Sequence, residues 1–280
     1  MIWAEHFLDT SSHLTININH CNYGSFPTPV HSHDQTPHNR LYSIAAHSPC
    51  NRSYICSHTD PDKKTELKAG NIYFIPGHYD LEYLFFPELI FTAIHFRLEP
   101  FTGFDIFSDE KEVRQLPDRD DIGEKVLELL QRSDSLGRTA QLKGLFLSLS
   151  GNFITHNSQT VLNMLTLKER YGHLFDWIRS NIRAGIRIDE LADIAGFSTE
   201  TLSRRFSRDT GTTLKQYLNR QLASEAAERL LASDKAIYEI AHALSFNDEY
   251  YFPRFFRRHT GLSPAEYRKR YRIDSLVEIL

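Results

Sequence analysis

The sequence predicts an α+β protein of two domains, in which a β-rich N-terminal half precedes an all-α C-terminal half. The length of 280 residues exceeds that of a typical single domain. Short β-rich runs fill residues 14–107, whereas helical periodicity with an internal repeat fills the C-terminal half. The 41% of hydrophobic and 24% of charged residues are typical of a globular chain.

The N-terminal half contains six runs with the composition of β-strands. Gly, Pro, Asn and Asp separate them, as is usual in a sandwich or barrel. The runs are Leu14–Ile18, Leu41–Ala45, Ser53–Ser57, Asn71–Ile75, Leu81–Phe86 and Ile90–Phe96. Residues 121–157 then return to helical period, with an apolar stripe on each side of Gly137. We therefore expect a sandwich or barrel followed by a pair of helices.

The termini and the cysteines predict a cytoplasmic protein. The N-terminal segment has neither the basic nor the apolar region of a secretory signal, and no run of 18 apolar residues occurs. Cys21, Cys50 and Cys56 are an odd number without the spacing of a zinc site. These features argue against secretion and against membrane insertion.

The net charge of −4 conceals an asymmetry between the two halves. Residues 1–164 carry 13 Lys and Arg against 20 Asp and Glu, whereas residues 165–280 carry 19 against 16. The basic clusters of the second half are Arg204, Arg205 and Arg208; Arg254, Arg257 and Arg258; and Arg268, Lys269, Arg270 and Arg272. Such clusters can bind phosphate groups even in an acidic chain, although a single cluster is also compatible with a solvated helix face.

An internal repeat organises the C-terminal half. The segments 188–197 and 237–246 share Ile, Glu, Ala and Phe at an offset of 49, and beyond that Phe the offset becomes 50. The later identities are Arg204/Arg254, Phe206/Phe256, Arg208/Arg258, Thr210/Thr260, Gly211/Gly261, Tyr217/Tyr267 and Arg220/Arg270. Two copies of one helical unit explain this pattern.

Each copy predicts a helix-turn-helix unit. In the first copy an apolar stripe ends at Gly196, and Ser198 caps the second helix. In the second copy the equivalent cap is Asn247. The capping boxes 213–216 and 263–266 begin the helices that follow the two units. The apolar residues expected in the core are Leu202, Phe206, Phe252 and Phe256.

A single helix over about residues 214–231 connects the copies, and its length is about 27 Å. Consecutive major-groove faces lie about 34 Å apart along one side of B-form DNA. A rigid helix of this length can therefore place two recognition helices in successive grooves. Their arginines suit guanine edges and phosphate oxygens.

Residues 171–272 resemble the DNA-binding domain of the AraC/XylS family of bacterial transcription regulators. The motifs that carry the resemblance are Ile240-Ala241, Phe246-Asn247-Asp248-x-x-Tyr251-Phe252-x-Arg254-x-Phe256-Arg257 and Gly261-x-Ser263-Pro264-x-x-Tyr267-Arg268. The chain departs from the family at Ser245, where Gly is usual, and at Gln221, where Arg is usual. Pro253 lies inside the second recognition helix, where we expect it to remove a backbone donor and bend the helix.

The resemblance implies which side chains contact DNA. The base-reading positions are Glu200, Ser203 and Arg204 in the first recognition helix and Glu249, Tyr250 and Arg254 in the second. The residues expected at the DNA backbone are Ser198, Arg205, Arg208, Asn247, Arg257 and Arg258. Phosphate contacts fix the register but read no sequence.

The N-terminal half resembles the cupin-like, jelly-roll domain that binds ligands in many members of this family. The resemblance depends on His31-Ser-His33 after Gly24 and on Gly70-Asn-Ile-Tyr-Phe-Ile-Pro76. It implies a small-molecule effector, and an interior of Tyr and Phe suits a sugar or another small ring. The candidate effector residues are His31, His33, Arg40, Tyr42, Tyr83 and His95, and for each of them ordinary packing is an equal alternative.

No metal or cofactor is predicted. His31, His33 and His38 suggest a metal site, because imidazoles two residues apart on a strand point to the same side. The metal-binding cupins, however, have a Glu near position 38 and a further His after the proline, where this chain has Asp80, Leu81 and Glu82.

These observations divide the chain into a cupin-like barrel (1–115), a helical pair (116–157), a linker (158–170) and a DNA-binding domain (171–280) that opens with a helix over 171–183. In the family such a helical pair packs against its twin, so we expect a homodimer; the alternative is that both helices cover the barrel. The predicted function is a non-enzymatic transcription regulator, an activator that binds double-stranded DNA under the control of a small molecule. RNA polymerase is a further candidate partner. A metal-dependent cupin enzyme with a DNA-binding tail and a ligand-independent regulator are the alternatives.

Overall fold

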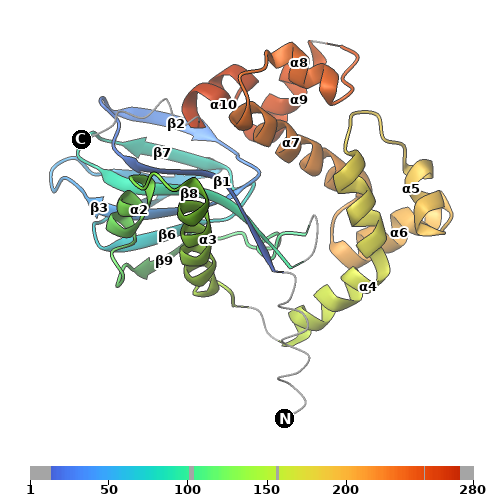
Figure 1. Ribbon diagram of the computed structural model, residues 1–280, viewed down its shortest axis with the longest axis horizontal. Helices are drawn as coiled ribbons and strands as arrows, with labels where there is room; N and C mark the ends of the chain where they lie inside the picture. Colours follow the sequence, from blue (N-terminus) through green and yellow to red (C-terminus); the bar gives the residue numbers. More distant parts are fainter. Residues whose placement is uncertain (1–13, 101–103, 156–157, 249, 272–280) are drawn as a thin grey trace.

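The protein consists of a β-sandwich and a helical domain that lie side by side (Figure 1). The computed structural model describes residues 14–100, 104–155, 158–248 and 250–271. The predicted α+β class, with a β-rich domain before an all-α domain, is confirmed. No helix within the described ranges is long and apolar enough to cross a bilayer.

The sandwich is built from two antiparallel sheets. The first has the strand order β1 (Thr15–Gly24), β8 (Ile90–Glu99), β3 (Asn39–Ala46), β6 (Asn71–Ile75) and β9 (Arg114–Pro117); the second has the order β2 (Val30–Asp34), β7 (Leu81–Phe85), β4 (Tyr54–Ser57) and β5 (Asp60–Glu66). All six predicted strands are present. The sequence does not predict β2, β5 and β9, which are edge strands with few buried side chains. The two sheets stay separate, so the jelly-roll-like domain is a sandwich rather than a closed barrel.

Period-two alternation divides the five-stranded sheet into two faces. Leu41, paired with both Phe74 and Ile94, lies on the outer face, whereas the neighbouring pair Tyr42 and Tyr73 lies on the inner face against the second sheet. All five side chains are almost completely buried. The inner face therefore forms the interior in which the sequence predicts an effector.

Two helices, α2 (Ile122–Leu130) and α3 (Ser135–Gly151), cover the outer face of the five-stranded sheet (Figure 1). The buried side chains of this helical pair are Ile122, Val126, Leu142, Phe146 and Leu149. The alternative expectation, that the pair covers the β-domain, accounts for these apolar stripes. A dimer would have to use other side chains, such as the exposed Leu136 and Leu147, and it stays a prediction.

The segment 158–170, which the sequence predicts to be a linker, is helical. It forms the first half of α4 (Ser158–Asn181), so that expectation is wrong. Met164, Leu167, Tyr171 and Leu174 follow each other at spacings of three or four and are buried against the helices that come next. The polar sequence of residues 155–160, which precedes this amphipathic pattern, is the reason why the sequence predicts a linker.

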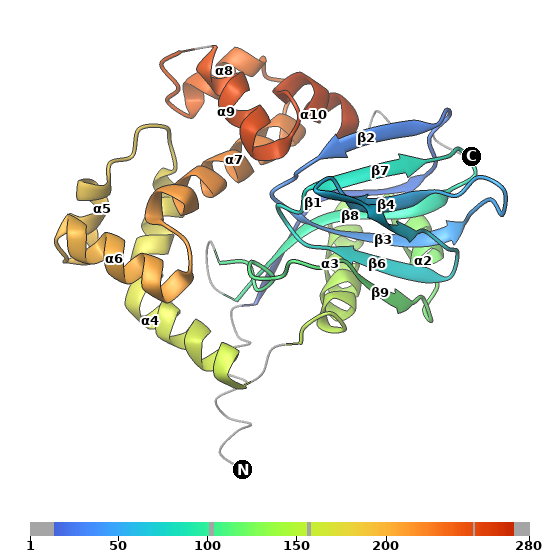
Figure 2. The ribbon, with the colours of Figure 1, turned by 180° about the vertical axis from the view of Figure 1, so that it is seen from behind.

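The helical domain contains two units at opposite ends of one long helix, α7 (Leu214–Ala232) (Figure 2). The first unit comprises α5 (Ile188–Ala195) and α6 (Thr199–Thr210), and the second comprises α8 (Ile237–Ala243) and α9 (Tyr251–Thr260); α10 (Pro264–Tyr271) follows. Each unit has a core of its own, to which α7 contributes Leu214, Tyr217 and Leu218 at one end and Leu222, Ala226 and Leu230 at the other. The predicted connecting helix and both predicted capping boxes are confirmed.

Backbone contacts join the second unit to the sandwich. The amide of Gln35, just after β2, donates a hydrogen bond of 2.9 Å to the carbonyl of Thr260 at the end of α9. Gly261 follows with a φ of 76°, and a Cβ at this position would lie 3.1 Å from the Cα of Asp34. Glycine is therefore required at position 261, both because the backbone is left-handed there and because the two domains approach each other closely.

Candidate DNA-binding surface and effector site

In the first unit, two residues define the turn between the helices. Gly196 ends α5 in the left-handed conformation with a φ of 68°, and Ser198 begins α6 because its Oγ accepts a hydrogen bond of 3.2 Å from the Thr201 amide. Leu202 and Phe206 are fully buried, which leaves the opposite face of α6 to solvent. The predicted cap at Ser198 is confirmed.

The second unit makes the same turn with a different residue. Ser245 is equivalent to Gly196 and has a φ of 58°, so the backbone conformation is kept although a side chain there costs about 1 kcal/mol. Pro253 is the third residue of α9, inside the first turn, where an amide has no acceptor within the helix. The expected loss of a backbone donor at Pro253 thus falls in the first turn, where it costs the helix least.

The start of α9 differs from the prediction. The N-cap residue is Tyr250, which provides no side-chain cap, so the predicted cap at Asn247 is wrong. Asp248 instead accepts a hydrogen bond of 2.8 Å from the amide of Tyr250 through Oδ1. The second recognition helix thus begins three residues later relative to the turn than a cap at Asn247 would give.

Most of the predicted base-reading residues lie on exposed parts of the two recognition helices. Glu200 and Arg204 on α6 are exposed, as are Tyr250 at the N-cap of α9 and Arg254 on α9, and Ser203 is half-buried. Tyr250 is 70% exposed. Glu249 lies outside the described residues.

The residues predicted at the DNA backbone have different local partners. Arg205 stacks over the ring of Phe197, with 5.1 Å between its guanidinium carbon and the ring centroid, and Arg208 donates to Asp209 at 2.9 Å. Ser198 acts as the helix cap described above. The remaining three residues, Asn247, Arg257 and Arg258, are exposed.

The six predicted effector residues divide into two groups, one on the outer surface of the sandwich and one in its interior. His31 and His33 lie on the solvent side of β2, because the alternating positions Ser32 and Asp34 point inward. The other four, Arg40, Tyr42, Tyr83 and His95, are buried in the interior. The structure therefore does not bring the six side chains into one pocket.

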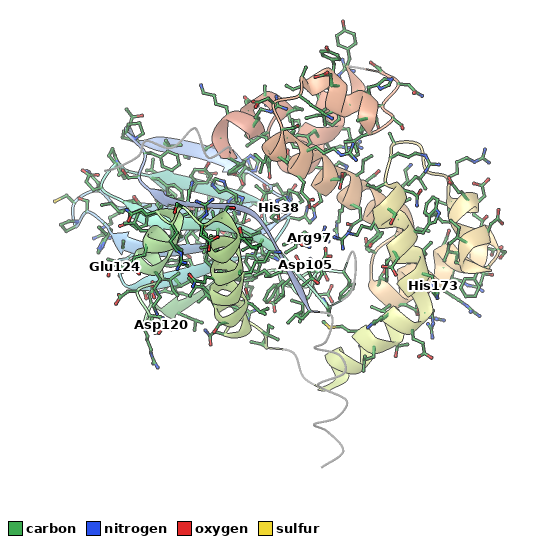
Figure 3. The ribbon with its side chains drawn as sticks, viewed as in Figure 1. His38, Arg97, Asp105, Asp120, Glu124 and His173 are labelled. Carbon is green, nitrogen blue, oxygen red and sulfur yellow. The ribbon has the colours of Figure 1, made fainter. Side chains whose placement is uncertain are left out.

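The two outer histidines belong to a network that we call the outer histidine cluster, made of His31, His33, His58, Asp80 and Glu82. Glu82 interacts with His31 at 3.0 Å and with His58 at 2.9 Å, and these contacts lower the pKa of its carboxyl group. His33 interacts with Asp80, and its ring stacks on His58 with centroids 4.2 Å apart. In the described residues no group of three His, Cys, Asp or Glu side chains has the arrangement of a metal site. His38 lies apart from the cluster and is buried between the domains (Figure 3).

The inner residues belong to a second network, the inner polar cluster, made of His20, Asp34, Arg40, His95 and Tyr271. Asp34 forms a buried ion pair with Arg40 and accepts a hydrogen bond of 2.6 Å from the hydroxyl of Tyr271, which belongs to α10 of the helical domain. The ring of Tyr271 lies 4.8 Å from that of His95 and 5.9 Å from that of His20, centroid to centroid. Three members, His20, Asp34 and Tyr271, are not among the predicted effector residues. The inward position of Asp34 could have been found from the strand alternation in His31-Ser-His33-Asp34.

Burial keeps the imidazoles of the inner polar cluster uncharged. It lowers the pKa of His20 to about 4 and that of His95 well below the usual value. Burial also raises the pKa of the Tyr271 phenol, and the neighbouring Asp34 carboxylate adds to this shift. The cluster therefore contains one ion pair, two neutral imidazoles and a neutral phenol.

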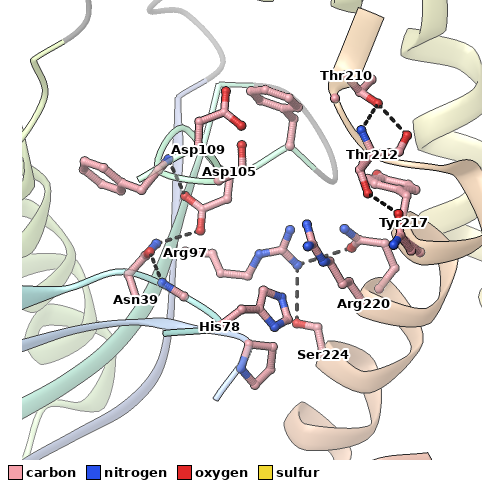
Figure 4. A pocket seen from close by; sticks show the side chains of 18 of the residues that line it. Asn39, His78, Arg97, Asp105, Asp109, Thr210, Thr212, Tyr217, Arg220 and Ser224 are labelled. Atoms are coloured by element: carbon pink, nitrogen blue, oxygen red, sulfur yellow. Dashed lines mark hydrogen bonds between the residues drawn. The ribbon is translucent and has the colours of Figure 1, made fainter. Parts of the chain in front are cut away.

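A cleft of about 370 Å³ separates the sandwich from α6 and α7. Arg97 enters it from β8, where it forms an ion pair of 2.9 Å with Glu99 and donates hydrogen bonds of 3.3 Å to Gln221 and Ser224 of α7 (Figure 4). Gln221, at the position where the family usually has Arg, thus contacts the other domain. Burial raises the pKa of the nearby Asp105 to about 6.

The chain combines a β-sandwich with two helix-turn-helix units at the ends of one connecting helix. This combination defines its class as a two-domain protein with a paired helix-turn-helix domain. Residues 191–270 match a family model described as a helix-turn-helix domain. The chain is similar to the HTH-type transcriptional activator RhaS of Yersinia pestis (strain Pestoides F), with 32% identity over 99 residues that make up 35% of this chain and 36% of RhaS. The same values hold for RhaS of Yersinia pseudotuberculosis serotype O:1b (strain IP 31758). The chain thus matches about a third of the length of these curated relatives.

The fold of the whole chain is similar to that of ToxT from Vibrio cholerae. ToxT from strain SCE256, in a structure described as bound to an unsaturated fatty acid, has a TM-score of 0.53 and 11% identity over 95% of this chain and 98% of ToxT. ToxT from strain O395 has a TM-score of 0.54 and 11% identity over 93% of this chain and 98% of ToxT. At this identity the similarity concerns the fold alone. The helix-turn-helix match and the similarity to RhaS agree with the resemblance of the C-terminal half to the AraC/XylS family.

Proposed function

We propose that the protein is a sequence-specific DNA-binding transcription regulator, and specifically an activator. The observation that carries this proposal is the equivalent placement of exposed arginines on two repeated helices. Arg204 on α6 and Arg254 on α9 are equivalent in the repeat, and both are exposed next to buried core residues of their own helix. A repeated cationic face of this kind is suited to two neighbouring sites on a polyanion.

The spacing of the units supports binding in successive major grooves. The 19 residues of α7 correspond to a helix of about 29 Å, close to the repeat of about 34 Å along one side of B-form DNA. Each half of α7 is buried in the core of one unit, so the helix acts as a rigid spacer. The two recognition helices are then held at a defined separation.

The proposal assigns different roles to the arginines. Arg204 and Arg254 read bases, because they lie near the N-terminal half of their helices, where recognition helices usually contact base edges. Arg205, Arg208, Arg257 and Arg258 contact phosphates and contribute affinity without sequence preference. The remaining predicted positions keep the roles that the family resemblance implies.

Control by a small molecule is the second part of the proposal. Its support is the fold neighbour ToxT, whose structure is described as bound to an unsaturated fatty acid, together with the buried polar side chains Arg40 and His95 inside the sandwich. We expect a sugar or another small ring as the effector. A homodimer, a cytoplasmic location and contact with RNA polymerase belong to the same proposal. A non-enzymatic role belongs to the proposal too, since the relatives that match the helix-turn-helix domain are described as transcriptional activators.

The test is a selection of binding sites from random double-stranded DNA by the full-length protein. A defined motif should emerge, and Arg204→Ala and Arg254→Ala should each weaken binding to it by about 1–3 kcal/mol and relax the preference at a few adjacent bases. Arg119→Ala, at an exposed position of the sandwich, is the matched control. Selection of no motif, or equal losses on selected and random DNA, would contradict the proposal.

A further inference from the structure

The side chain of Tyr271 occupies the place where the sequence predicts an effector. Tyr271 is the last described residue of α10 in the helical domain, yet its ring is buried inside the mouth of the sandwich, and α10 lies at the edge formed by β2 (Figures 1 and 2). It contacts His95 and approaches Arg40, Tyr42 and Tyr83, the inner members of the predicted effector set. One domain thus places an aromatic side chain in the candidate binding site of the other.

The inner polar cluster makes specific contacts with each part of this side chain. The phenol hydroxyl donates a hydrogen bond of 2.6 Å to Oδ2 of Asp34, whose other oxygen is held by Arg40. The rings of His95 and Tyr267 flank the aromatic ring at centroid distances of 4.8 and 4.7 Å. A carboxylate at one end and rings on the sides are the features that recognise a phenol rather than an aliphatic chain.

Several buried polar atoms beside Tyr271 form no hydrogen bond with its side chain. Nδ1 of His20, Nδ1 of His95 and Nε of Arg40 have no hydrogen-bond partner among the described residues, although each side chain is at least nine-tenths buried. A buried polar atom without a partner costs free energy, and a ligand that satisfies it binds more tightly. A phenol with a second hydrogen-bonding group would satisfy more of the site than tyrosine does.

We propose that the inner polar cluster is a binding site for a small phenol that carries a second polar group, such as a catechol, and that Tyr271 fills this site as an internal ligand. Binding of the free phenol displaces Tyr271 and separates α10 from the sandwich. This inference builds on the proposed function, because it names the chemical class of the effector and the contact that the effector breaks.

The displacement reaches the second unit through short connections. The Tyr267 hydroxyl lies 3.5 Å from Nδ1 of the buried His38, and the ring of Tyr267 packs on Phe256 of α9 at 5.2 Å. The amide of Gln35, next to Asp34, holds the last carbonyl of α9. Loss of the contact between Tyr271 and Asp34 therefore loosens the attachment of the second recognition helix, while the first unit keeps its own core.

Ligand rescue of a cavity tests the site directly. In full-length Tyr271→Ala, 4-methylphenol should raise the midpoint of thermal unfolding saturably and should bind about tenfold or more tightly than toluene, because only the phenol donates to Asp34. 4-Methylcatechol should bind at least as tightly as 4-methylphenol. Tyr238→Ala, which removes an exposed tyrosine of α8, is the matched control and should show no such rescue.

Three results would overturn the inference. Equal binding of toluene and 4-methylphenol would mean that the cavity is only apolar. An unchanged preference for 4-methylphenol after a further Asp34→Ala substitution would mean that Asp34 does not recognise the hydroxyl group. Stabilisation of the wild-type protein by hexoses but not by catechols would replace the phenol with a sugar.

A second variant covers the case in which Tyr271→Ala does not fold. Tyr271→Phe keeps the ring and loses the hydroxyl, so amide hydrogen exchange in α10 should become faster than in the wild type. Unchanged exchange in α10 would contradict the role of the hydroxyl. In the wild type, 4-methylcatechol should likewise accelerate exchange in α10. None of these measurements contains DNA, so a protein that binds phenols but selects no DNA motif would refute the proposed function and leave this inference standing.

Discussion

The two helix-turn-helix units share one backbone plan but are held by different parts of the molecule. The first unit is attached to α4, where Arg170 forms an ion pair with Asp209 at the end of α6 and Tyr171 donates to the same carboxylate at 2.9 Å. The second unit is attached to the sandwich through Thr260 and through the tyrosines of α10. The comparison indicates that the sandwich controls the second unit more directly than the first.

The largest difference should appear when the core of each unit is damaged. Phe206→Ala and Phe256→Ala each remove a fully buried ring and should lower the free energy of unfolding by about 3–5 kcal/mol. Because Phe256 packs on Tyr267, only Phe256→Ala should also accelerate amide exchange in α10 under native conditions. Chemical denaturation and hydrogen exchange measure the two effects. Equal acceleration in α10 by both variants would contradict separate attachment of the units.

Acid should loosen the second unit before the first. Burial lowers the pKa of His20 to about 4 and that of His78 to about 3, so the folded state favours their neutral forms. Their contribution to stability is complete above the usual histidine pKa of about 6.5 and is lost as the pH falls from there through these values. Between pH 7 and pH 5, amide exchange in α9 and α10, corrected for its intrinsic pH dependence, should increase more than exchange in α5 and α6.

Asp105 provides an internal control with the opposite sign. Its pKa is raised to about 6, so its contribution favours folding at low pH and is lost as the pH rises through that value. Asp105→Asn should therefore make the acid-induced loss of stability steeper, while His20→Gln should make it shallower. A wild-type profile in which both units loosen together would refute the difference in attachment.

Phosphate contacts should distinguish the units less strongly. Arg258→Ala should reduce the slope of log affinity against log salt concentration by about one. Arg208→Ala should reduce it less, because Arg208 already pairs with Asp209 and must give up part of that contact to bind phosphate. Binding to the selected site in a salt series measures both slopes, and an unchanged slope for Arg258→Ala removes this residue from the DNA backbone set.

The smallest effect concerns the turns. Ser245→Gly relieves a positive φ and should stabilise the protein by about 0.5–1 kcal/mol, whereas Gly196→Ala should destabilise it by about 1 kcal/mol. Thermal unfolding of the two variants checks the pair. If Ser245→Gly is destabilising, the serine side chain must make a favourable contact that outweighs the strain.

Much of the fold could be predicted because its signals are local. The strand Asn71–Ile75 has the predicted boundaries, and the capping box at Thr213 and Gln216 forms as expected, since both depend on neighbouring residues. The strand Asp60–Glu66 could not be found, because it lies at an edge and all its side chains except that of Pro61 are polar. Helix α4 could have been extended from the spacing of Met164, Leu167 and Tyr171.

The candidate effector site could be predicted only in part. Arg40 and His95 are inside the sandwich as expected, but the register of β2 turns His31 and His33 to solvent. The contact between Asp34 and Tyr271 joins residues 237 positions apart, and no sequence pattern indicates it. Contacts between domains form only where the surfaces of two folded domains meet. No local periodicity in the sequence indicates which residues those contacts will involve.

Hydroxyl-radical footprinting of the full-length protein on its selected DNA tests the central claim most directly. Two protected segments should lie on one face of the duplex with centres about 10 base pairs apart, and Arg204→Ala and Arg254→Ala should each weaken a different segment. A single protected segment, or two segments on opposite faces, would contradict the paired insertion of α6 and α9 into successive major grooves.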